Sequence, residues 1–371
     1  MLKQQTQKLE LSEDQQKAFN HILTWIREAN SPELSLGGYA GTGKTTLIKE
    51  LMRTIDRNVL VMSLTGKAVS VLVKKGVDAA TIHSSIYHVH IEKKKPVFTL
   101  RSVLEEHPDV LVVDEASMVS TQLYEDLLSF NVPVLWVGDH GQLEPIGKNP
   151  GVMRDPTIKL EKIHRQAAGN PIIMFADRVR KGGIPAAIIG NDDEYISKVK
   201  KSGIQPKVLC SADQIICGIN RTRVKVNKVV RENLFGENYT DSPIPGDRVV
   251  CLKNDRKQGL FNGLQGIVVA VDTDKSWPIY HLMVKLDTGD VWRGQAHVDQ
   301  FNKTKGLLEV ERPLWSVTHW DYAYAVTCHK SQGSEWPHVL VIEESAGPLW
   351  CMKRWRYTAI TRASERLTYA C

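Results

Sequence analysis

The segment GYAGTGKT at residues 38–45 constrains the fold of this chain more than any other. It matches the pattern GxxxxGK followed by Ser or Thr, in which glycines let the backbone curl so that its N–H groups face a phosphate. That geometry requires a strand before the loop and a helix after it. The flanking sequences ELSLGGY and TLIKELMRTI have these patterns, so the segment predicts a parallel α/β sheet with a phosphate site at the carboxyl end of a strand.

Further apolar segments extend the predicted sheet through the first part of the chain. NVLVMSLT, DVLVVDEA and VPVLWVGD lack polar alternation, as expected of strands that helices cover on both faces, whereas STQLYEDLLSF has a helical pattern. We assign residues 1–155 to a first α/β domain. Within it, the segment 84–107, which carries the lysine run EKKKP, is expected to form a small protrusion.

The rest of the chain predicts a second α/β domain with an insertion. We assign residues 156–242 and 312–371 to this domain, with VLVIEE and RLTYA as strands. Between them, residues 243–311 contain DRVVCLKN, GIVVAVDT, YHLMVKLDTGD and VWRG, which read as strands joined by Gly, Asp and Asn turns. This stretch without helices predicts a small inserted β-barrel.

Several side chains near the predicted phosphate site suit nucleotide hydrolysis. Lys44 would reach the β and γ phosphates, and the Thr45 hydroxyl would meet Mg²⁺. Asp114 and Glu115 end an apolar strand, where Asp114 would hold the metal and Glu115 would polarise the attacking water. The alternative for this acidic pair is an N-terminal cap of the next helix. Gln142, after a third strand, could sense the γ-phosphate through its neutral amide or belong to an ordinary polar loop.

Two arginines in the second half of the chain are candidates for transition-state contacts. Arg165 and Arg362 lie far from the phosphate loop in sequence, in the second α/β domain. A γ-phosphate needs cationic donors during transfer, and donors from another domain would make hydrolysis depend on domain closure. The alternative for each arginine is a surface ion pair.

Composition narrows the class of protein and its partners. The 371 residues are 42% hydrophobic and 24% charged, which suits two or three globular units, and the net charge of +6 favours a polyanionic partner weakly. The six cysteines form no CxxC pair, so neither a zinc site nor a disulfide framework is indicated. The N-terminus has no apolar signal segment, and no apolar run reaches about 18 residues. We therefore expect a monomeric cytoplasmic protein that does not contact a membrane.

The order of motifs along the chain is similar to that of superfamily 1 helicases. The sequences of these motifs resemble those of the B-type branch, the RecD/Dda-like group, and they span residues 11–363. The matching segments are Gln15, GYAGTGKTT, SLTGKA, TIHS, VVDEAS, VGDHGQLEPIG, IHRQ, AVTCHKSQGSEW and YTAITRA. The resemblance implies two RecA-like P-loop NTPase domains that bind ATP and Mg²⁺ between them. It also implies an inserted SH3-like β-barrel, single-stranded DNA across the upper faces of both domains, and movement from 5′ to 3′.

The resemblance assigns roles residue by residue. The residues that it implies contact nucleotide are Gln15, which reads adenine, and Gly38, Gly41, Thr42, Gly43, Lys44, Thr45, Thr46, Gly333 and Glu335. Those that it implies contact DNA are Thr65, Gly66, Lys67, Thr81, His83, Thr327, His329 and Lys330. Without the family, the segments around Thr65 and Thr81 are plain strand-to-helix turns.

Two aromatic positions and one departure from the family remain open. Members of the group split duplexes with a hairpin that has an aromatic tip, for which Phe98 or Tyr87 is the candidate. The alternative is that these rings anchor the protrusion to its domain. Many relatives in other branches have an aromatic residue before the arginine that matches Arg165, whereas His164 stands here and either stacks on adenine or packs.

The leading functional hypothesis is a DNA-stimulated ATPase that unwinds duplex from a 5′ single-stranded tail. Its expected partners are single-stranded DNA, junctions of single-stranded and duplex DNA, and single-strand-binding or replication proteins. One alternative is a translocase that strips proteins from DNA without unwinding, which a strand-displacement assay would distinguish. Another is a nucleotide-gated DNA-binding loader, which negligible strand-stimulated phosphate release would favour.

Overall fold

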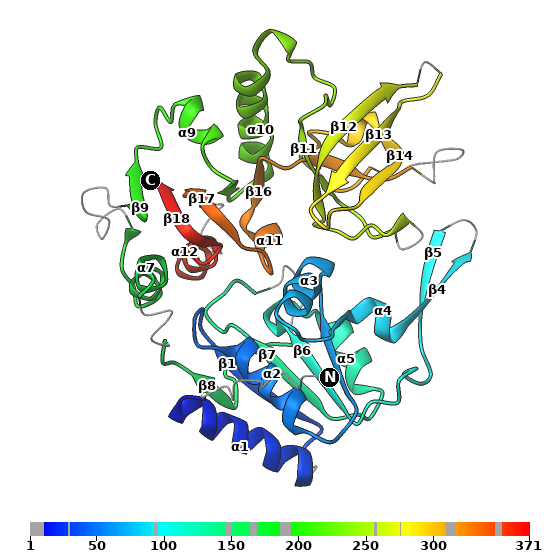
Figure 1. The fold of residues 1–371 in the computed structure, drawn as a ribbon, viewed down its shortest axis with the longest axis vertical. Helices are drawn as coiled ribbons and strands as arrows, with labels where there is room; N and C mark the ends of the chain where they lie inside the picture. The colour runs from blue at the N-terminus through cyan, green and yellow to red at the C-terminus, as the bar shows by residue number, and fades with distance from the viewer. Residues whose placement is uncertain are drawn as a thin grey trace, which may run out of the picture. The chain divides into compact units, whose positions relative to one another are not determined.

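A computed structural model of the chain describes residues 11–28, 30–92, 95–144, 150–163, 169–185, 194–255, 258–274, 276–308, 317–345 and 351–371. The chain divides into two compact units, one of Met1–Leu64 with Ala68–Gly169 and one of Thr65–Lys67 with Asn170–Cys371. Each unit contains a parallel sheet with helices, which confirms the predicted α/β class (Figure 1). Among the described residues, no helix has both the length and the apolar character needed to cross a bilayer.

The first unit is built on a six-stranded parallel sheet with the order β3-β2-β6-β7-β1-β8. Its strands are β1 (Glu33–Gly38), β2 (Val59–Ser63), β3 (Ala80–Thr81), β6 (Val110–Asp114), β7 (Val134–Gly138) and β8 (Ile158–Leu160). Its helices are α1 (Glu13–Glu28), α2 (Lys44–Thr54), α3 (Gly66–Lys74), α4 (Ile82–Ile86), the 3₁₀ turn η1 (Ala116–Met118) and α5 (Thr121–Leu128).

Side chains of the central strands alternate between two apolar clusters, because successive residues of a strand point to opposite faces. On β6, Val110 and Val112 join the cluster that contains residues of α1 and α2. Leu111 and Val113 join the cluster that contains residues of α4 and α5. Helices thus cover both faces, which explains why these strands carry continuous apolar runs.

A two-stranded antiparallel hairpin extends from the first unit. It pairs β4 (Tyr87–Glu92) with β5 (Lys95–Leu100), from Tyr87 opposite Leu100 to Glu92 opposite Lys95. The hairpin lies within the segment 84–107 that the sequence predicts to protrude, and Figure 1 shows it beside α4, separate from the six-stranded sheet.

The second unit contains a five-stranded parallel sheet with the order β16-β10-β17-β18-β9. Its strands are β9 (Ile196–Val199), β10 (Gln214–Cys217), β16 (Ala325–Thr327), β17 (Trp336–Ile342) and β18 (Ala363–Ala370). The helices are α7 (Pro171–Arg180), α9 (Pro206–Cys210), α10 (Asn220–Phe235), α11 (Cys328–Ser331) and α12 (Met352–Ile360), with the 3₁₀ turn η2 (Gly236–Asn238) after α10.

An antiparallel sheet interrupts this second unit, as the β-rich sequence predicts. Its order is β14-β13-β12-β11-β15, with β11 (Arg248–Cys251), β12 (Gln265–Thr273), β13 (Ile279–Leu286), β14 (Val291–His297), the 3₁₀ turn η4 (Val298–Gln300) and β15 (Trp320–Tyr322). A bridge between Ala296 and Thr318 brings the end of β14 beside the residues that precede β15, so the sheet closes on itself at that point. Its assignment to the SH3-like class stays a prediction.

Two short strands lie beyond the boundaries expected from the sequence. β8 pairs with β1 and therefore adds residues 158–160 to the first sheet, past the expected boundary at 155. β15 pairs with β11 and adds residues 320–322 to the inserted sheet, past the expected end at 311. Each is three residues long, and its place depends on pairing with a strand far away in sequence rather than on a local pattern.

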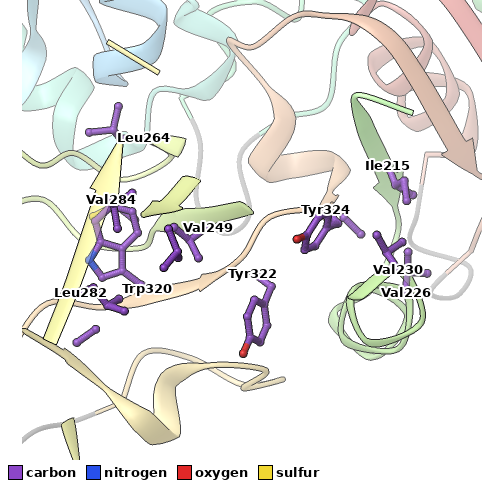
Figure 2. Packing of buried hydrophobic residues seen from close by; sticks show 14 of the residues in the cluster. Ile215, Val226, Val230, Val249, Leu264, Leu282, Val284, Trp320, Tyr322 and Tyr324 are labelled. Atoms are coloured by element: carbon purple, nitrogen blue, oxygen red, sulfur yellow. The ribbon is translucent and has the colours of Figure 1, made fainter. Parts of the chain in front are cut away.

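The inserted sheet and the second parallel sheet share one apolar core. Figure 2 shows Trp320 beside Val284 and Val249 of the inserted sheet, and Tyr324 beside Ile215 of the parallel sheet. Tyr322 lies between these two groups on the strand that connects the sheets. The inserted sheet is therefore packed onto the rest of the second unit.

Candidate nucleotide and nucleic-acid sites

The strand order of the first unit determines which motifs are neighbours. Because all six strands are parallel, their carboxyl ends lie along one edge of the sheet. Along this edge the strands end, in order, at Thr81, Ser63, Asp114, Gly138 and Gly38, before the short β8. The phosphate loop after β1, the loop after β7 that contains Gln142, and the carboxylate pair Asp114 and Glu115 at the end of β6 are thus on neighbouring strands. The segments expected to contact DNA follow the two strands beyond Asp114.

The loop between β1 and α2 has the geometry of a phosphate cradle. Gly41 and Gly43 have φ angles of 77° and 80°, a left-handed conformation that favours glycine. At Gly38 an added Cβ would lie 2.6 Å from Thr42 Oγ1 and 3.1 Å from Lys44 Cγ. The loop is therefore tightly closed before α2 begins at Lys44, where the free N–H groups of the first helical turn suit an anion.

Two buried side chains brace this loop. Thr42 Oγ1 donates to the carbonyl of Tyr39 at 2.9 Å, and Gln15 Nε2 donates to the carbonyl of Thr42 at 3.2 Å. Gln15 Oε1 in turn accepts from the N–H of Ser12 at 3.0 Å. Gln15 therefore lies beside the phosphate loop, and its contact with adenine stays a prediction.

Lys44 and Asp114 are oppositely charged residues at the carboxyl edge of the first sheet. Lys44 Nζ donates to the carbonyls of Gly38 at 2.7 Å and Tyr39 at 3.1 Å. Desolvation raises the pKa of Asp114 to about 7, the negative charge of Glu115 adds to the increase, and the positive charge of Lys44 opposes it. A cation beside Asp114 would favour its ionised form for the same electrostatic reason.

The backbone turns sharply at Glu115, the residue that follows the end of β6. Its φ of 55° is in the left-handed region, which is uncommon for a residue with a side chain and costs about 1–2 kcal/mol. The residue stands directly before the 3₁₀ turn η1, and its own side chain makes no capping hydrogen bond there. The side chain of Glu115 therefore does not cap η1, which was the alternative role considered for it from the sequence.

The residues at this edge fit a magnesium ion bound together with a nucleotide. Mg²⁺ in such sites takes one or two protein oxygens and otherwise phosphate and water oxygens. The Thr45 hydroxyl in the first turn of α2 and the Asp114 carboxylate supply that small set. No group of three or more His, Cys, Asp or Glu side chains arranged for a metal occurs within the described ranges.

The loop that follows β7, which contains Gln142, is ordered around Asp139. This buried carboxylate accepts from the N–H of Gly141 at 2.8 Å and from Gln142 Nε2 at 3.3 Å. The same loop contacts the phosphate loop, because the rings of His140 and Tyr39 have centroids 4.1 Å apart. Sequence reasoning did not single out this ring pair, although both residues stand inside recognised motifs. Gln142 therefore lies in an ordered loop after β7, and β7 is the neighbour of β1, the strand that leads into the phosphate loop.

Of the two candidate arginines, only Arg362 lies in the described part of the chain; Arg165 and His164 lie outside it. Arg362 is 6% exposed and follows α12. Its guanidinium donates to the carbonyls of Thr358 and Ser334 and to Thr361 Oγ1, each at 3.1 Å. The surface ion pair considered from the sequence is therefore not its role. Its direction toward a nucleotide stays a prediction.

The segment that includes Gly333 and Glu335 is tied to this arginine. Gly333 has a φ of 70°, and the carbonyl of Ser334 accepts from Arg362. Glu335 is exposed, and the N–H of Trp336 bonds the carbonyl of Arg362 at 2.9 Å. These contacts group the segment with Arg362, while its expected position near the ribose is untested.

The expected DNA-contacting segments that follow β2 and β3 are strand-to-helix turns. Thr65 follows β2, and Gly66 and Lys67 begin α3. Thr81 ends β3 and caps α4, because its hydroxyl accepts from the N–H of Ser84 at 3.2 Å. The first turn of a helix carries N–H groups that have no partner within the helix, and backbone and hydroxyl donors are the groups that bind phosphates without reading sequence.

Three aromatic rings link α4 to the hairpin. The centroid of the His83 ring lies 5.7 Å from that of Tyr87 and 6.2 Å from that of Phe98, and Tyr87 and Phe98 are 6.0 Å apart. Tyr87 is buried and its hydroxyl donates to Asp126, so Tyr87 anchors the hairpin. Phe98 is 48% exposed, which leaves its ring accessible for stacking. Phe98 pairs with Val89, three pairs before the last pair Glu92–Lys95, and Tyr87 stands in the first pair, so neither candidate is at the tip of the hairpin.

In the second unit, the expected DNA contacts surround α11. Thr327 ends β16 and precedes the helix, and His329 and Lys330 lie on it. Burial lowers the pKa of His329 below its usual 6.5, so near neutral pH its ring is uncharged. Lys330 is the exposed cation of this turn.

Sequence families match both parts of the chain. An AAA domain family matches residues 10–201, just over half of the chain, and a UvrD-like helicase C-terminal domain family matches residues 322–368. The chain belongs to the AAA domain family. The two matches, in this order, also confirm the resemblance to superfamily 1 helicases that the motifs indicate.

Known proteins similar to this AAA-family chain include helicases. The ATP-dependent RecD2 DNA helicase of Deinococcus radiodurans is 30% identical over 359 residues, covering 89% of this chain and 46% of that protein. The chain spans about half or less of the length of the first curated relatives that it matches.

Two solved structures share the fold of both units. One shows two Pif1 helicases at forked duplex DNA, with a TM-score of 0.59 and 20% identity, and covers 98% of this chain and 92% of the other. The second is Pif1 from Bacteroides with ADP-AlF3 and single-stranded DNA, with a TM-score of 0.58 and 19% identity, covering 98% and 93%. These likenesses establish the two-domain α/β helicase fold for the AAA-family chain.

Proposed function

We propose that this chain is an ATP-driven helicase that moves from 5′ to 3′ along single-stranded DNA and separates duplex DNA. The observation that carries the proposal is the strand order β6-β7-β1, which groups Asp114, Glu115, Gln142 and Lys44 at one edge of a parallel sheet. The RecD2 relative is named an ATP-dependent DNA helicase, and the Pif1 structures contain single-stranded or forked DNA. These names support the choice of DNA as partner.

In the proposed reaction, the first unit binds and activates ATP. Lys44 exchanges its carbonyl partners for the β and γ phosphate oxygens, and the N–H groups of the loop surround the phosphates. Thr45 and Asp114 hold Mg²⁺, which when bound neutralises charge on the phosphates. Glu115 orients the attacking water and accepts its proton. Gln142 bonds the γ-phosphate and moves its loop when that phosphate leaves.

Arg165 and Arg362 act in the proposal as donors from the second unit. They stabilise charge that develops on the transferred phosphoryl group, so that hydrolysis proceeds when the two units close on ATP. Alternating closure and opening, with alternating grip on DNA, would then move the protein along the strand. Gly333 and Glu335 complete the nucleotide site near the ribose.

DNA binds in this proposal along the far part of the same edge. One set of contacts is Thr65, Gly66, Lys67, Thr81 and His83, which follow β2 and β3. In the sheet, β6 and β7 separate these two strands from β1 and the phosphate loop. Thr327, His329 and Lys330 provide the grip of the second unit, and Phe98 meets the base pair to be opened. A monomeric cytoplasmic protein that meets single-strand-binding or replication proteins on DNA belongs to the same proposal.

The test is unwinding of matched duplexes that carry only a 5′ or only a 3′ single-stranded tail, with and without ATP. We expect ATP-dependent strand displacement from the 5′ tail alone, and no displacement with Lys44→Ala. The Lys44→Ala variant should still bind single-stranded DNA, because the predicted strand contacts lie elsewhere. Displacement from the 3′ tail would overturn the polarity. Strand-stimulated phosphate release without displacement would favour a translocase, and neither activity would favour a nucleotide-gated loader.

A further inference from the structure

Helix α10 presents polar residues to the interior of the second unit. Arg223, Asn227 and Arg231 recur every fourth residue and are buried, together with Val226 and Val230. Positions that face a core at this spacing are ordinarily apolar. The desolvation cost of such groups requires that each be well paired.

Arg231 is paired with a carboxylate at the start of the inserted sheet. Its Nε donates to Asp247 Oδ1 at 2.7 Å and its Nη2 to Asp247 Oδ2 at 2.9 Å. The Tyr324 hydroxyl donates to the same Asp247 Oδ1 at 3.0 Å. The guanidinium also stacks over Tyr322, 3.9 Å from the ring centroid. A bidentate pair of this kind constrains orientation as well as distance.

The other two side chains bind the strand that connects the sheets. Asn227 Nδ2 donates to the carbonyl of Tyr322 at 3.1 Å, and Asn227 Oδ1 accepts from the N–H of Ala325 at 2.7 Å. Arg223 Nη1 donates to Asp321 Oδ2 at 2.6 Å. Every member of the row thus contacts residues 321–325 or their neighbour Asp247.

Residues 321–325 join two parts of the proposed motor. Upstream they belong to β15 of the inserted sheet, and downstream they enter β16, which ends at Thr327 beside the expected DNA contacts of α11. A hinge in this connection would let the insert swing independently of Thr327. The row on α10 holds the connection at both ends and removes that freedom.

We propose that Arg223, Asn227 and Arg231 are positioning residues that lock the inserted sheet to the second parallel sheet, so that the insert and Thr327–Lys330 move as one body during the ATP cycle. The inference rests on the proposed helicase function. A buried ion pair is often replaceable by apolar residues of similar volume without loss of stability. Such a replacement separates the geometric role of the pair from a stabilising one.

The experiment replaces Arg231→Met together with Asp247→Leu in the full chain. The matched control replaces the Arg180–Asp177 pair of α7, 2.5 Å apart in the same unit, in the same way. We expect single-strand-stimulated ATP turnover within about twofold of wild type, but about fivefold fewer base pairs opened per ATP. Amide exchange in residues 320–327 should accelerate about tenfold, and the control should change neither quantity.

The outcomes separate this inference from the proposed function. Unchanged exchange and unchanged yield per ATP in a folded double variant would overturn the inference, as would a loss of ATP turnover proportional to the loss of unwinding. If wild-type protein does not unwind DNA, the proposed function fails, while amide exchange still tests the lock. Should the double variant not fold, Tyr324→Phe removes a single hydroxyl donor to Asp247, and the same two readouts decide in the same directions.

Discussion

A single methyl group at Gly38 should disable the proposed nucleotide site. In Gly38→Ala the new Cβ would lie 2.6 Å from Thr42 Oγ1, 3.1 Å from Lys44 Cγ and 3.2 Å from Leu160 Cβ. Thr42 is fully buried and bonds the carbonyl of Tyr39, so its hydroxyl has little room to turn aside. The loop must instead shift away from β1.

The size of the shift follows from these contacts. Ordinary van der Waals contact begins at about 3.4 Å, so the Thr42 hydroxyl must move by about 0.8 Å and the Lys44 stem by about 0.3 Å. A misplacement approaching 1 Å costs up to about a hundredfold in rate, so we expect kcat/KM for ATP to fall by about ten- to a hundredfold. Overpacking should lower the free energy of unfolding by about 1–3 kcal/mol.

Gly294→Ala is the matched control, because its Cβ would lie 2.3 Å from Trp292 Cζ2 in the inserted sheet. It should lose a similar free energy of unfolding, about 1–3 kcal/mol, while keeping kcat/KM within about twofold. Phosphate release with saturating single-stranded DNA and thermal unfolding measure the two quantities. The reasoning is refuted if Gly38→Ala retains wild-type kcat/KM, or if both variants lose activity in proportion to stability.

Four further predictions address other parts of the molecule. Glu115→Gln should bind ATP as wild type does and lose about 10²- to 10⁴-fold in turnover, and an equal loss of binding would contradict a base role. Arg362→Ala should keep ATP binding but lose about a thousandfold in ATP turnover. Its melting temperature should also fall, because the buried carbonyls of Thr358 and Ser334 lose their donor. Retained turnover would refute the role of Arg362 in hydrolysis. Phe98→Ala should slow unwinding without changing the melting temperature, whereas Tyr87→Phe should cost about 1 kcal/mol of stability; the reverse pattern would exchange their roles. Burial lowers the pKa of His338 below 6.5, so the unfolded chain binds more protons than the folded one as the pH falls below 6.5. The stability contributed by the neutral ring is therefore present above pH 6.5 and lost on acidification. His338→Gln should flatten the decline of the free energy of unfolding below pH 6.5, and an unchanged slope would refute this prediction.

The sequence was sufficient to predict the first sheet and its phosphate loop because both depend on local patterns. Continuous apolar runs predicted β2, β6 and β7, and glycine spacing predicted the turn before α2. The order of strands at the edge was not deducible from such runs. Only the pairing of β1 with β7 explains why His140 contacts Tyr39, a neighbour 101 positions away in sequence.

Burial of charged residues was the feature that the sequence concealed. A helix written NRTRVKVNKVVRENLF reads as a solvated basic surface, since its apolar residues are few and its charges many. The buried partners of Arg231 and Arg223 lie 16 and 98 residues away. Asp247 stands in the segment that the sequence assigns to the inserted barrel, and Asp321 stands beyond that segment, where the sequence pattern predicted no strand. The sequence signal for this burial was that Arg223, Asn227 and Arg231 recur every four residues, on the same helical face as Val226 and Val230. Polar side chains in phase with an apolar face require partners on whatever packs against that face, and here that surface is the connection between the two sheets. A geometric role for the row therefore follows from where its partners lie, and not from the charge of the helix.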